Sequence, residues 1–104
     1  MSSIIHINDN NFDQEVLQSN IPVLVDFSAH WCSPCARQEP ILEKFAQENI
    51  GKIKICKIDI EESLITTKNY NIHSVPTLIV FKSGKVVNTK SGLSTLMQIQ
   101  ALVQ

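Results

Sequence analysis

The sequence predicts a single α/β domain with a central mixed sheet of five strands flanked by four helices. Short apolar segments alternate with segments of helical periodicity, in the order strand, helix, strand, helix, strand, helix, strand, strand, helix. Strands joined through helices are expected to run parallel with right-handed crossovers, and the last two strands to form an antiparallel hairpin. The sheet would combine three parallel-connected strands with a C-terminal hairpin. A length of 104 residues suits one domain over 1–104.

The N-terminal segment is expected to form a strand and then a helix. The first apolar segment, "IIHI" (4–7), is short, as is usual for a strand. The next segment, "NNFDQEVLQS" (10–19), has helical spacing, and Asp9 or Asn10 is its candidate N-cap. The apolar side of this helix consists of Phe12, Val16 and Leu17.

The following two segments are expected to form a buried strand and a long helix. The segment "PVLVDFS" (22–28) is apolar on both faces apart from Asp26, which is typical of a strand covered on both sides. The segment "ARQEPILEKFAQEN" (36–49) has helical periodicity. Pro34 suits the first turn of this helix, whereas Pro40 is expected to kink it. The apolar stripe consists of Ile41, Leu42, Phe45 and Ala46.

The C-terminal half is expected to supply the other three strands and two helices. The segment "KIKICKIDI" (52–60) is predicted as a strand, and "ESLITTKNYN" (62–71) as a weaker helix. Two further strands, 76–81 and 86–90, flank "KSGK" (82–85), which is a favourable hairpin turn. The last helix is predicted over 94–103, with Leu96, Ile99 and Val103 facing the core.

Composition excludes several classes of protein. The net charge is −1, and no run of basic residues indicates a nucleic-acid surface. Apolar runs are far shorter than the roughly 18 residues of a membrane span. The N-terminus lacks the basic and apolar regions of a signal peptide, so we expect a cytoplasmic protein without membrane partners. An odd number of cysteines does not indicate a structural disulfide framework.

Two of the three cysteines lie in the segment "HWCSPC" (30–35), between the predicted buried strand and the long helix. This position is the carboxyl end of a strand, where open α/β sheets place their sites. Cys32 would lie near the helix N-terminus, where free N–H groups favour an anion such as a thiolate. Cys35 is close enough to form a disulfide with it. The pair is therefore interpreted as a redox couple: Cys32 attacks a substrate disulfide, and Cys35 displaces the mixed disulfide.

Two other interpretations of the cysteines carry less weight. A zinc site needs about four ligands, and only Cys32, Cys35 and His30 are at hand, so no metal site is expected. Cys56 lies in the middle of a predicted strand and suits an inert core position. His30 could tune the thiolate electrostatically, although an exposed loop histidine is the simpler interpretation.

Asp26 is a lone carboxyl group in an otherwise apolar strand. Burial disfavours the ionised form, so the pKa of Asp26 should be raised. A carboxyl group of that kind behind a thiol can transfer protons near neutral pH. The alternative is that Asp26 caps or hydrogen-bonds local backbone, and the residues alone do not decide between the two.

Four segments together resemble the thioredoxin family: "VLVDFSAHWCSPC", "KIDIEE", "VPTLIVFKSGK" and "SGLS". The resemblance runs in order from about Ile4 to the end of the chain, and its active-site variant is WCSPC. It implies the thioredoxin fold and a thiol–disulfide oxidoreductase that reduces disulfides in protein substrates. It also implies recycling by an NADPH-dependent flavoprotein, thioredoxin reductase. No cofactor beyond the Cys32–Cys35 disulfide is expected, and the chain should act as a monomer.

The resemblance also assigns roles to individual residues. Cys32 would be the nucleophile and Cys35 the resolving cysteine, with Asp26 as the proton acceptor of Cys35 through water, and Lys57 as its charged neighbour. Pro76 would be a cis-proline that faces the disulfide. The remaining substrate-binding residues implied by the resemblance are Trp31, Ser33, Pro34, Ile60, Ser74, Val75 and Gly92.

Several positions depart from the usual pattern of the family. Ser33 and Ser74 stand where glycine is usual, Ser28 where tryptophan is usual, and Ala36 where lysine is frequent. Asn71 replaces another frequent glycine, and asparagine is the mildest replacement if that residue has a positive φ. None of these changes removes a catalytic group, but they leave the potential and the partners open.

The departures give opposite expectations for the reduction potential. A hydrogen bond from the Ser33 hydroxyl to a Cys32 thiolate would raise the potential by up to roughly 30–65 mV. The missing lysine at Ala36 acts in the other direction, although Arg37 could compensate. Two alternative functions stay open: a more oxidising disulfide oxidase or isomerase, and a thioredoxin-fold binding subunit with incidental thiols.

Overall fold

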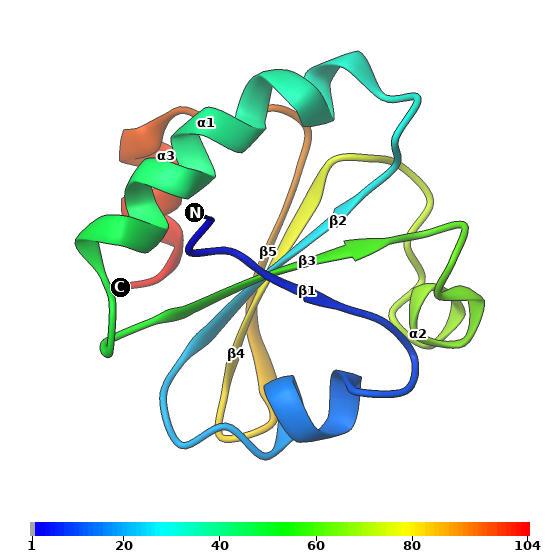
Figure 1. The fold of residues 1–104 in the computed structure, drawn as a ribbon, viewed down its shortest axis with the longest axis horizontal. Helices are drawn as coiled ribbons and strands as arrows, with labels where there is room; N and C mark the ends of the chain where they lie inside the picture. Colours follow the sequence, from blue (N-terminus) through cyan, green and yellow to red (C-terminus); the bar gives the residue numbers. More distant parts are fainter. Residues whose placement is uncertain (1) are drawn as a thin grey trace.

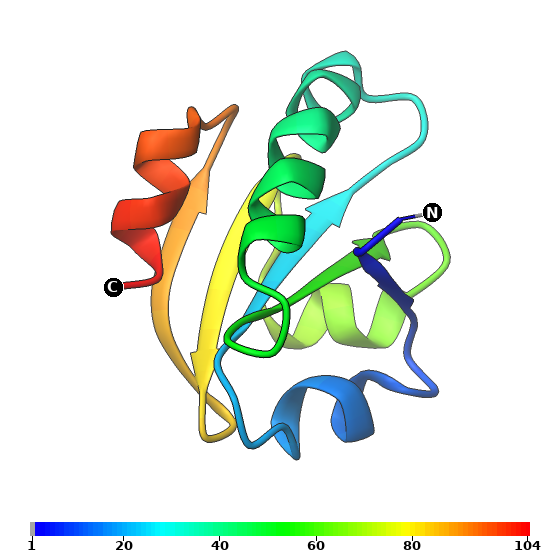
Figure 2. The same cartoon turned by 60° about the vertical axis from the view of Figure 1, so that its left-hand side comes forward.

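The computed structural model describes residues 2–104 and contains a five-stranded sheet with helices on both faces (Figures 1 and 2). The strands lie in the order β1-β3-β2-β4-β5. Their bounds are β1 (Ile5–Ile7), β2 (Val23–Ser28), β3 (Lys54–Asp59), β4 (Thr77–Lys82) and β5 (Lys85–Ser91). The helical elements are the π-helical turn η1 (Asp13–Leu17) and the helices α1 (Ser33–Glu48), α2 (Leu64–Asn69) and α3 (Leu96–Leu102).

The alternation of side chains along β2 supplies two separate cores. Leu24 packs in one cluster with Leu42 of α1 and Ile99 of α3. Val25 points to the opposite face and packs in a second cluster with Val16 of η1. Figure 2 shows α1 and α3 on one side of the sheet and η1 and α2 on the other. Every residue of β2 is buried, which confirms the prediction of a strand covered on both faces.

The expectation that strands joined through a helix run parallel is wrong for β4. β1, β3 and β2 are parallel, but β4 pairs antiparallel with β2, with Phe27 opposite Thr77. The six-residue α2 advances the chain by only about 9 Å, whereas a six-residue strand such as β3 spans about 20 Å. In the structure, the connection does not return to the edge where β3 begins. β4 starts at the edge where β2 and β3 end.

The prediction of a helix over 10–19 is wrong in extent, and Asp9 does not cap it. Only η1 is helical there, preceded by Phe12 without a side-chain cap. The Asp9 carboxylate instead accepts hydrogen bonds from the backbone N–H groups of Ile65 (3.2 Å) and Thr66 (2.9 Å) and from the Thr66 hydroxyl (2.7 Å). The hydroxyl bond is the main reason that the pKa of Asp9 is lowered. Asp9 therefore caps the first turn of α2.

The other three helices agree with the prediction apart from a few residues at their ends. Pro40 lies inside α1, which continues through it to Glu48. Thr95 caps α3: its hydroxyl accepts a hydrogen bond from the backbone N–H of Gln98, and its own backbone N–H donates to Oε1 of Gln98. No helix within residues 2–104 has the length and apolar character of a membrane span.

Left-handed backbone conformations occur where the sequence suggests turns. Ser83 and Gly84 connect β4 to β5 with φ angles of 52° and 76°, as hairpin turns of this length favour. A Cβ atom on Gly84 would lie 2.9 Å from the carbonyl oxygen of Leu17. This position therefore requires glycine both for its positive φ and for this close approach. Asn71 has a φ of 56°, which asparagine tolerates better than most residues.

Cys56 should be inert in the folded protein. Its side chain is fully buried in the core between the sheet and η1, and burial raises the pKa of its thiol to about 12. We expect a water-soluble maleimide to label Cys32 in the reduced native protein, and Cys56 only after unfolding. Mass spectrometry counts the adducts. Rapid native labelling of Cys56 would contradict the packing of this core.

Candidate active site

The two active-site cysteines lie where β2 has ended and α1 begins. Cys32 has extended backbone (φ −94°, ψ 110°) and is the N-cap of α1, and Cys35 lies in the first turn. The two sulfurs form a disulfide, with 5.3 Å between the Cα atoms. The backbone N–H of Cys35 donates to Sγ of Cys32 at 3.2 Å. This N–H is one of the free donors of the helix N-terminus, so the helix itself stabilises charge on Cys32.

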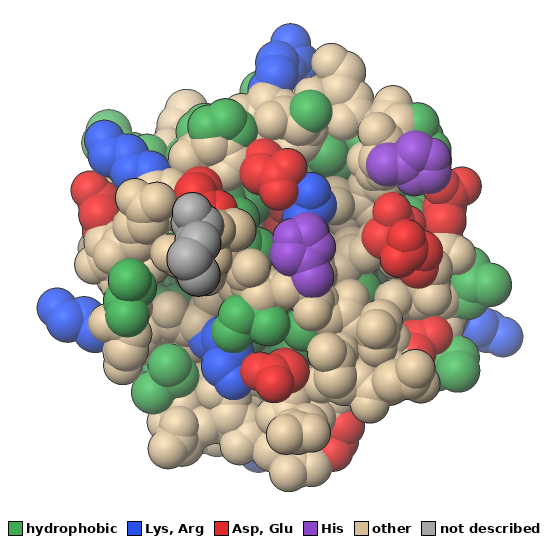
Figure 3. Space-filling view, in the orientation of Figure 1, with side chains coloured by type: hydrophobic (Ala, Val, Ile, Leu, Met, Phe, Trp, Pro, Cys, Tyr) green, Lys and Arg blue, Asp and Glu red, His purple; other side chains and the backbone are tan. Residues whose placement is uncertain are grey.

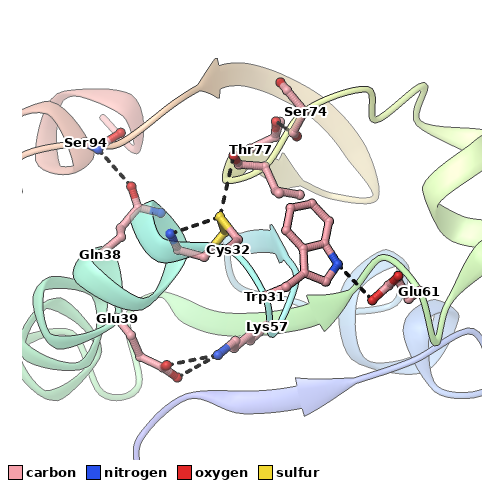
Figure 4. The surroundings of a disulfide bond; sticks show 11 residues. Trp31, Cys32, Gln38, Glu39, Lys57, Glu61, Ser74, Thr77 and Ser94 are labelled. Atoms are coloured by element: carbon pink, nitrogen blue, oxygen red, sulfur yellow. Dashed lines mark hydrogen bonds and ion pairs between the residues drawn. A yellow bond between two sulfur atoms is a disulfide. The ribbon is translucent and has the colours of Figure 1, made fainter.

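The start of β4 covers the disulfide from the opposite side. The Val75–Pro76 peptide bond is cis, and the carbonyl oxygen of Val75 lies 3.8 Å from Sγ of Cys32 (Figure 4). Val75 and Ile60 pack against the buried cluster of Ala29, Cys32 and Cys35. The N–H of Gly92, just after β5, donates to the carbonyl oxygen of Pro76 at 2.8 Å. Three segments distant in sequence therefore meet at the disulfide, and the antiparallel direction of β4 is what brings Pro76 there.

Trp31 forms an exposed apolar surface beside the disulfide. Its side chain is 61% exposed, and its Nε1–H donates to Oε1 of Glu61 at 3.0 Å (Figure 4). Glu61 is exposed and precedes α2, so its partner Trp31 lies in a segment 30 residues earlier in the chain. Ser33 and Ser74 are exposed. The carbonyl oxygen of Ser74 accepts a hydrogen bond from the Thr77 hydroxyl at 2.7 Å.

Asp26 is buried on the face of β2 that α1 covers. It is 1% exposed, and within residues 2–104 its Oδ1 has no hydrogen-bond partner. Burial raises the pKa of Asp26 to about 7, with Lys57 lowering it and Glu39 raising it by smaller amounts. The unpartnered oxygen disfavours the alternative that Asp26 caps local backbone. It is a carboxyl group that changes its protonation near neutral pH.

Lys57 lies opposite Asp26 in the sheet register, but its ammonium group binds a different carboxylate. Nζ of Lys57 lies 2.9 Å and 3.0 Å from the two oxygens of Glu39 (Figure 4). The sequence analysis did not single out Glu39. One signal was available, because Glu39 follows Cys35 by four residues and so shares its helix face.

Comparisons with known proteins agree with this geometry. A sequence model of the thioredoxin family matches residues 3–104. The chain belongs to the thioredoxin family. It is 42% identical to the thioredoxin of Haemophilus influenzae over 92 residues, which cover 88% of this chain and 86% of that protein. It is 40% identical to the thioredoxin of Pseudomonas aeruginosa over 100 residues, covering 96% and 93%. Like other thioredoxins, it is a thiol–disulfide oxidoreductase, and Cys32–Cys35 is its redox pair.

The residues that depart from the usual family pattern differ in how they affect the structure. In the disulfide form, the donor to Sγ of Cys32 is the N–H of Cys35, and within residues 2–104 no side-chain hydrogen bond of Ser33 reaches it. Ser28 is buried and lines a hollow of about 260 Å³ beside the active site. On the face of the molecule seen in Figure 3, histidine side chains lie near carboxylate side chains. The hollow is lined by His6, Ile7, Asn8, Ser28, His30, Lys57, Asp59 and Glu62.

The histidine beside the active site does not complete a metal centre. His30 is 78% exposed, and its Nδ1 lies 3.7 Å from Oδ2 of Asp59 and 3.6 Å from Oε1 of Glu61. Across residues 2–104, no three His, Cys, Asp or Glu side chains converge as metal ligands. His30 is an exposed loop residue with two acidic neighbours, which would attract its ring whenever it is protonated.

Proposed function

We propose that the chain reduces disulfides in proteins with Cys32 as nucleophile and Cys35 as resolving thiol. The position of Cys32 as N-cap of α1 supports this proposal most directly, because the N–H of Cys35 already points at its sulfur. The Cys32 thiolate attacks one sulfur of a substrate disulfide, and the other substrate sulfur leaves as a thiolate. Cys35 then attacks Sγ of Cys32 and releases the second substrate thiolate. The substrate gains two electrons, and the Cys32–Cys35 disulfide forms.

Asp26 would accept the proton that Cys35 must lose before it attacks. Its pKa of about 7 suits a group that takes up a proton in one step and releases it in another near neutral pH. Lys57, opposite Asp26 on the adjacent strand β3, is its charged neighbour. Because no direct bond joins Asp26 to the disulfide, transfer through a water molecule fits this burial best.

The substrate would bind across the exposed side of the disulfide. An extended segment can pair with the backbone at Ser74 and Val75, which precede the cis-proline Pro76. Trp31 offers exposed apolar area, and Ile60 borders the cysteines. Ser33, Pro34 and Gly92 complete the proposed surface. An NADPH-dependent flavoprotein, thioredoxin reductase, would regenerate the dithiol at the same surface. The resemblance further supports a monomer that works in the cytoplasm without a bound cofactor.

The reduction potential of the Cys32–Cys35 pair tests the direction of the reaction. We expect a reversible two-electron transition within a few tens of millivolts of about −270 mV, the value typical of thioredoxin. Equilibration in thiol–disulfide buffers of graded potential, followed by quenching with a maleimide, gives the ratio of the two forms. A potential near that of the oxidising periplasmic proteins, about −120 mV, would contradict a reductase. The variant Ser33→Gly measures how much of any difference in reduction potential from this value comes from the Ser33 hydroxyl.

A further inference from the structure

Glu39 and Lys57 form an ion pair close enough to Asp26 to act on it electrostatically. Both carboxylate oxygens of Glu39 contact Nζ of Lys57, at 2.9 Å and 3.0 Å, so the ammonium group is held on the side of α1. The side chain of Lys57 is 25% exposed and that of Glu39 is 40% exposed. The pair joins α1 to β3, and Lys57 lies opposite Asp26 in the register of β2 and β3.

The Lys57 ammonium is the charge that favours an ionised Asp26, and Glu39 acts against it. A positive charge near a carboxyl group favours the carboxylate, whereas a negative charge favours the protonated acid. Asp26 shows both effects, with Lys57 and Glu39 opposing each other. Because Glu39 engages Lys57 through two bonds, it also limits how far the ammonium group can move toward Asp26.

Other titratable groups around Asp26 come from β1, β5 and α1. His6 on β1 pairs with Lys57 in the same row of the sheet. On the other side of Asp26, Leu78 of β4 is its partner in the sheet, and Lys90 of β5 is the partner of Leu78. Nζ of Lys90 donates to the carbonyl oxygen of Leu93 at 3.4 Å. Cys35, in the first turn of α1, is buried. Of these neighbours, Lys57 and Glu39 are the charges that act on Asp26.

We propose that Glu39 is a positioning residue for the proton transfer at Asp26, acting through the Lys57 ammonium group that it holds. The proposal rests on the proposed role of Asp26 as proton acceptor of Cys35. A carboxylate that binds its proton more tightly is a stronger base, and it removes the proton of the Cys35 thiol more readily. The thiolate then attacks Sγ of Cys32, and the proton remains on Asp26 until water takes it up. Glu39 therefore adjusts the basicity of Asp26 without touching the sulfurs.

The variant Glu39→Gln tests the proposal, because it keeps the size of the side chain and removes its charge. The readouts are the NMR titration of the Asp26 carboxyl carbon and the pH dependence of mixed-disulfide resolution. We expect Glu39→Gln to lower the midpoint of the Asp26 titration by about half a pH unit or more. The pH profile of the resolution step should move in the same direction. Glu48→Gln, at an exposed position near the end of α1, is the matched control and should change neither.

A second pair of variants, both carrying Lys57→Met, separates an effect of Glu39 on Asp26 through Lys57 from a direct effect. In Lys57→Met, the same Glu39→Gln change should move the midpoint less, because the group that Glu39 holds is gone. An equal shift in both backgrounds would show that Glu39 does not act through Lys57 and would overturn the proposal. An unchanged midpoint in Glu39→Gln would overturn it as well.

The variant Asp26→Asn distinguishes failure of this inference from failure of the proposed function. If Asp26→Asn changes the pH profile of resolution but Glu39→Gln leaves the Asp26 midpoint in place, only the role of Glu39 is wrong. If Asp26→Asn resolves mixed disulfides with the profile of the unmodified protein, Asp26 is not the proton acceptor. The proposed role of Glu39 in proton transfer would then be wrong as well, because it depends on that role of Asp26.

Discussion

Replacing Cys32 with serine should abolish disulfide reduction, with a loss of at least about a thousandfold in rate, because a serine hydroxyl does not replace a thiolate nucleophile. Replacing Cys35 with serine should give a different result. The first attack still occurs, but no thiol resolves the product, and the mixed disulfide with Cys32 accumulates. Cleavage of a fluorescent peptide dimer joined by a disulfide measures the rate. Mass spectrometry under non-reducing conditions detects the trapped adduct.

Cys56→Ser is the matched control for both variants, because Cys56 is fully buried in the other core and takes no part in the proposed exchange. It should retain the rate of the unmodified protein. The double variant Cys32→Ser, Cys35→Ser separates chemistry from binding. If the protein still carried out its cellular role without either thiol, the fold would serve as a binding module and the redox pair would be incidental to that role.

The parts of the fold that the sequence predicts well are those encoded by local patterns. β2 is apolar on both faces, and both faces are buried. The turn at Ser83 and Gly84 has the residues that a hairpin requires. By contrast, the direction of β4 depends on how far the connection through α2 carries the chain, and segment periodicity does not reveal this.

Asp9 illustrates a second limit of local patterns. It precedes an amphipathic segment and looks like its N-cap, yet its carboxylate caps α2 through Thr66, 57 residues further along the chain. A side chain that can cap one helix can equally cap another, and only the packing of η1 and α2 on the same face of the sheet decides between them.

In the candidate site, too, local patterns are predictable from the sequence, whereas contacts between distant segments are not. The disulfide pair Cys32–Cys35 follows from a short motif, and the burial of Asp26 follows from a carboxyl group in an apolar strand. Glu39 and Glu61 were missed because their partners, Lys57 and Trp31, come from other segments. A charged residue on a helix face gives no sign in the sequence of which side chain it will meet.

Asp26→Asn should remove most of the pH dependence of stability near neutral pH. The folded protein has an Asp26 pKa of about 7, against 3.8 for an unperturbed aspartate, so the native state binds this proton more tightly than the unfolded state. The unfolding free energy therefore falls as the pH rises from about 4 to about 7, by up to about 4 kcal/mol at 1.36 kcal/mol per pKa unit. Asparagine cannot ionise, so the variant avoids this loss.

Urea unfolding of the oxidised protein at about pH 4 and pH 8 measures the effect. At the lower pH, the two proteins should differ little, because pH 4 lies close to the unfolded-state pKa of 3.8 and ionisation of the unfolded chain has lowered the stability by only about 0.6 kcal/mol. At the higher pH, Asp26→Asn should be more stable by as much as a few kcal/mol, and the exposed control Glu48→Gln should not. An equal stability difference at both pH values would show that Asp26 does not titrate as a buried group. The proton-acceptor role would then lose its physical basis, because that role needs a carboxyl group whose burial raises its affinity for a proton.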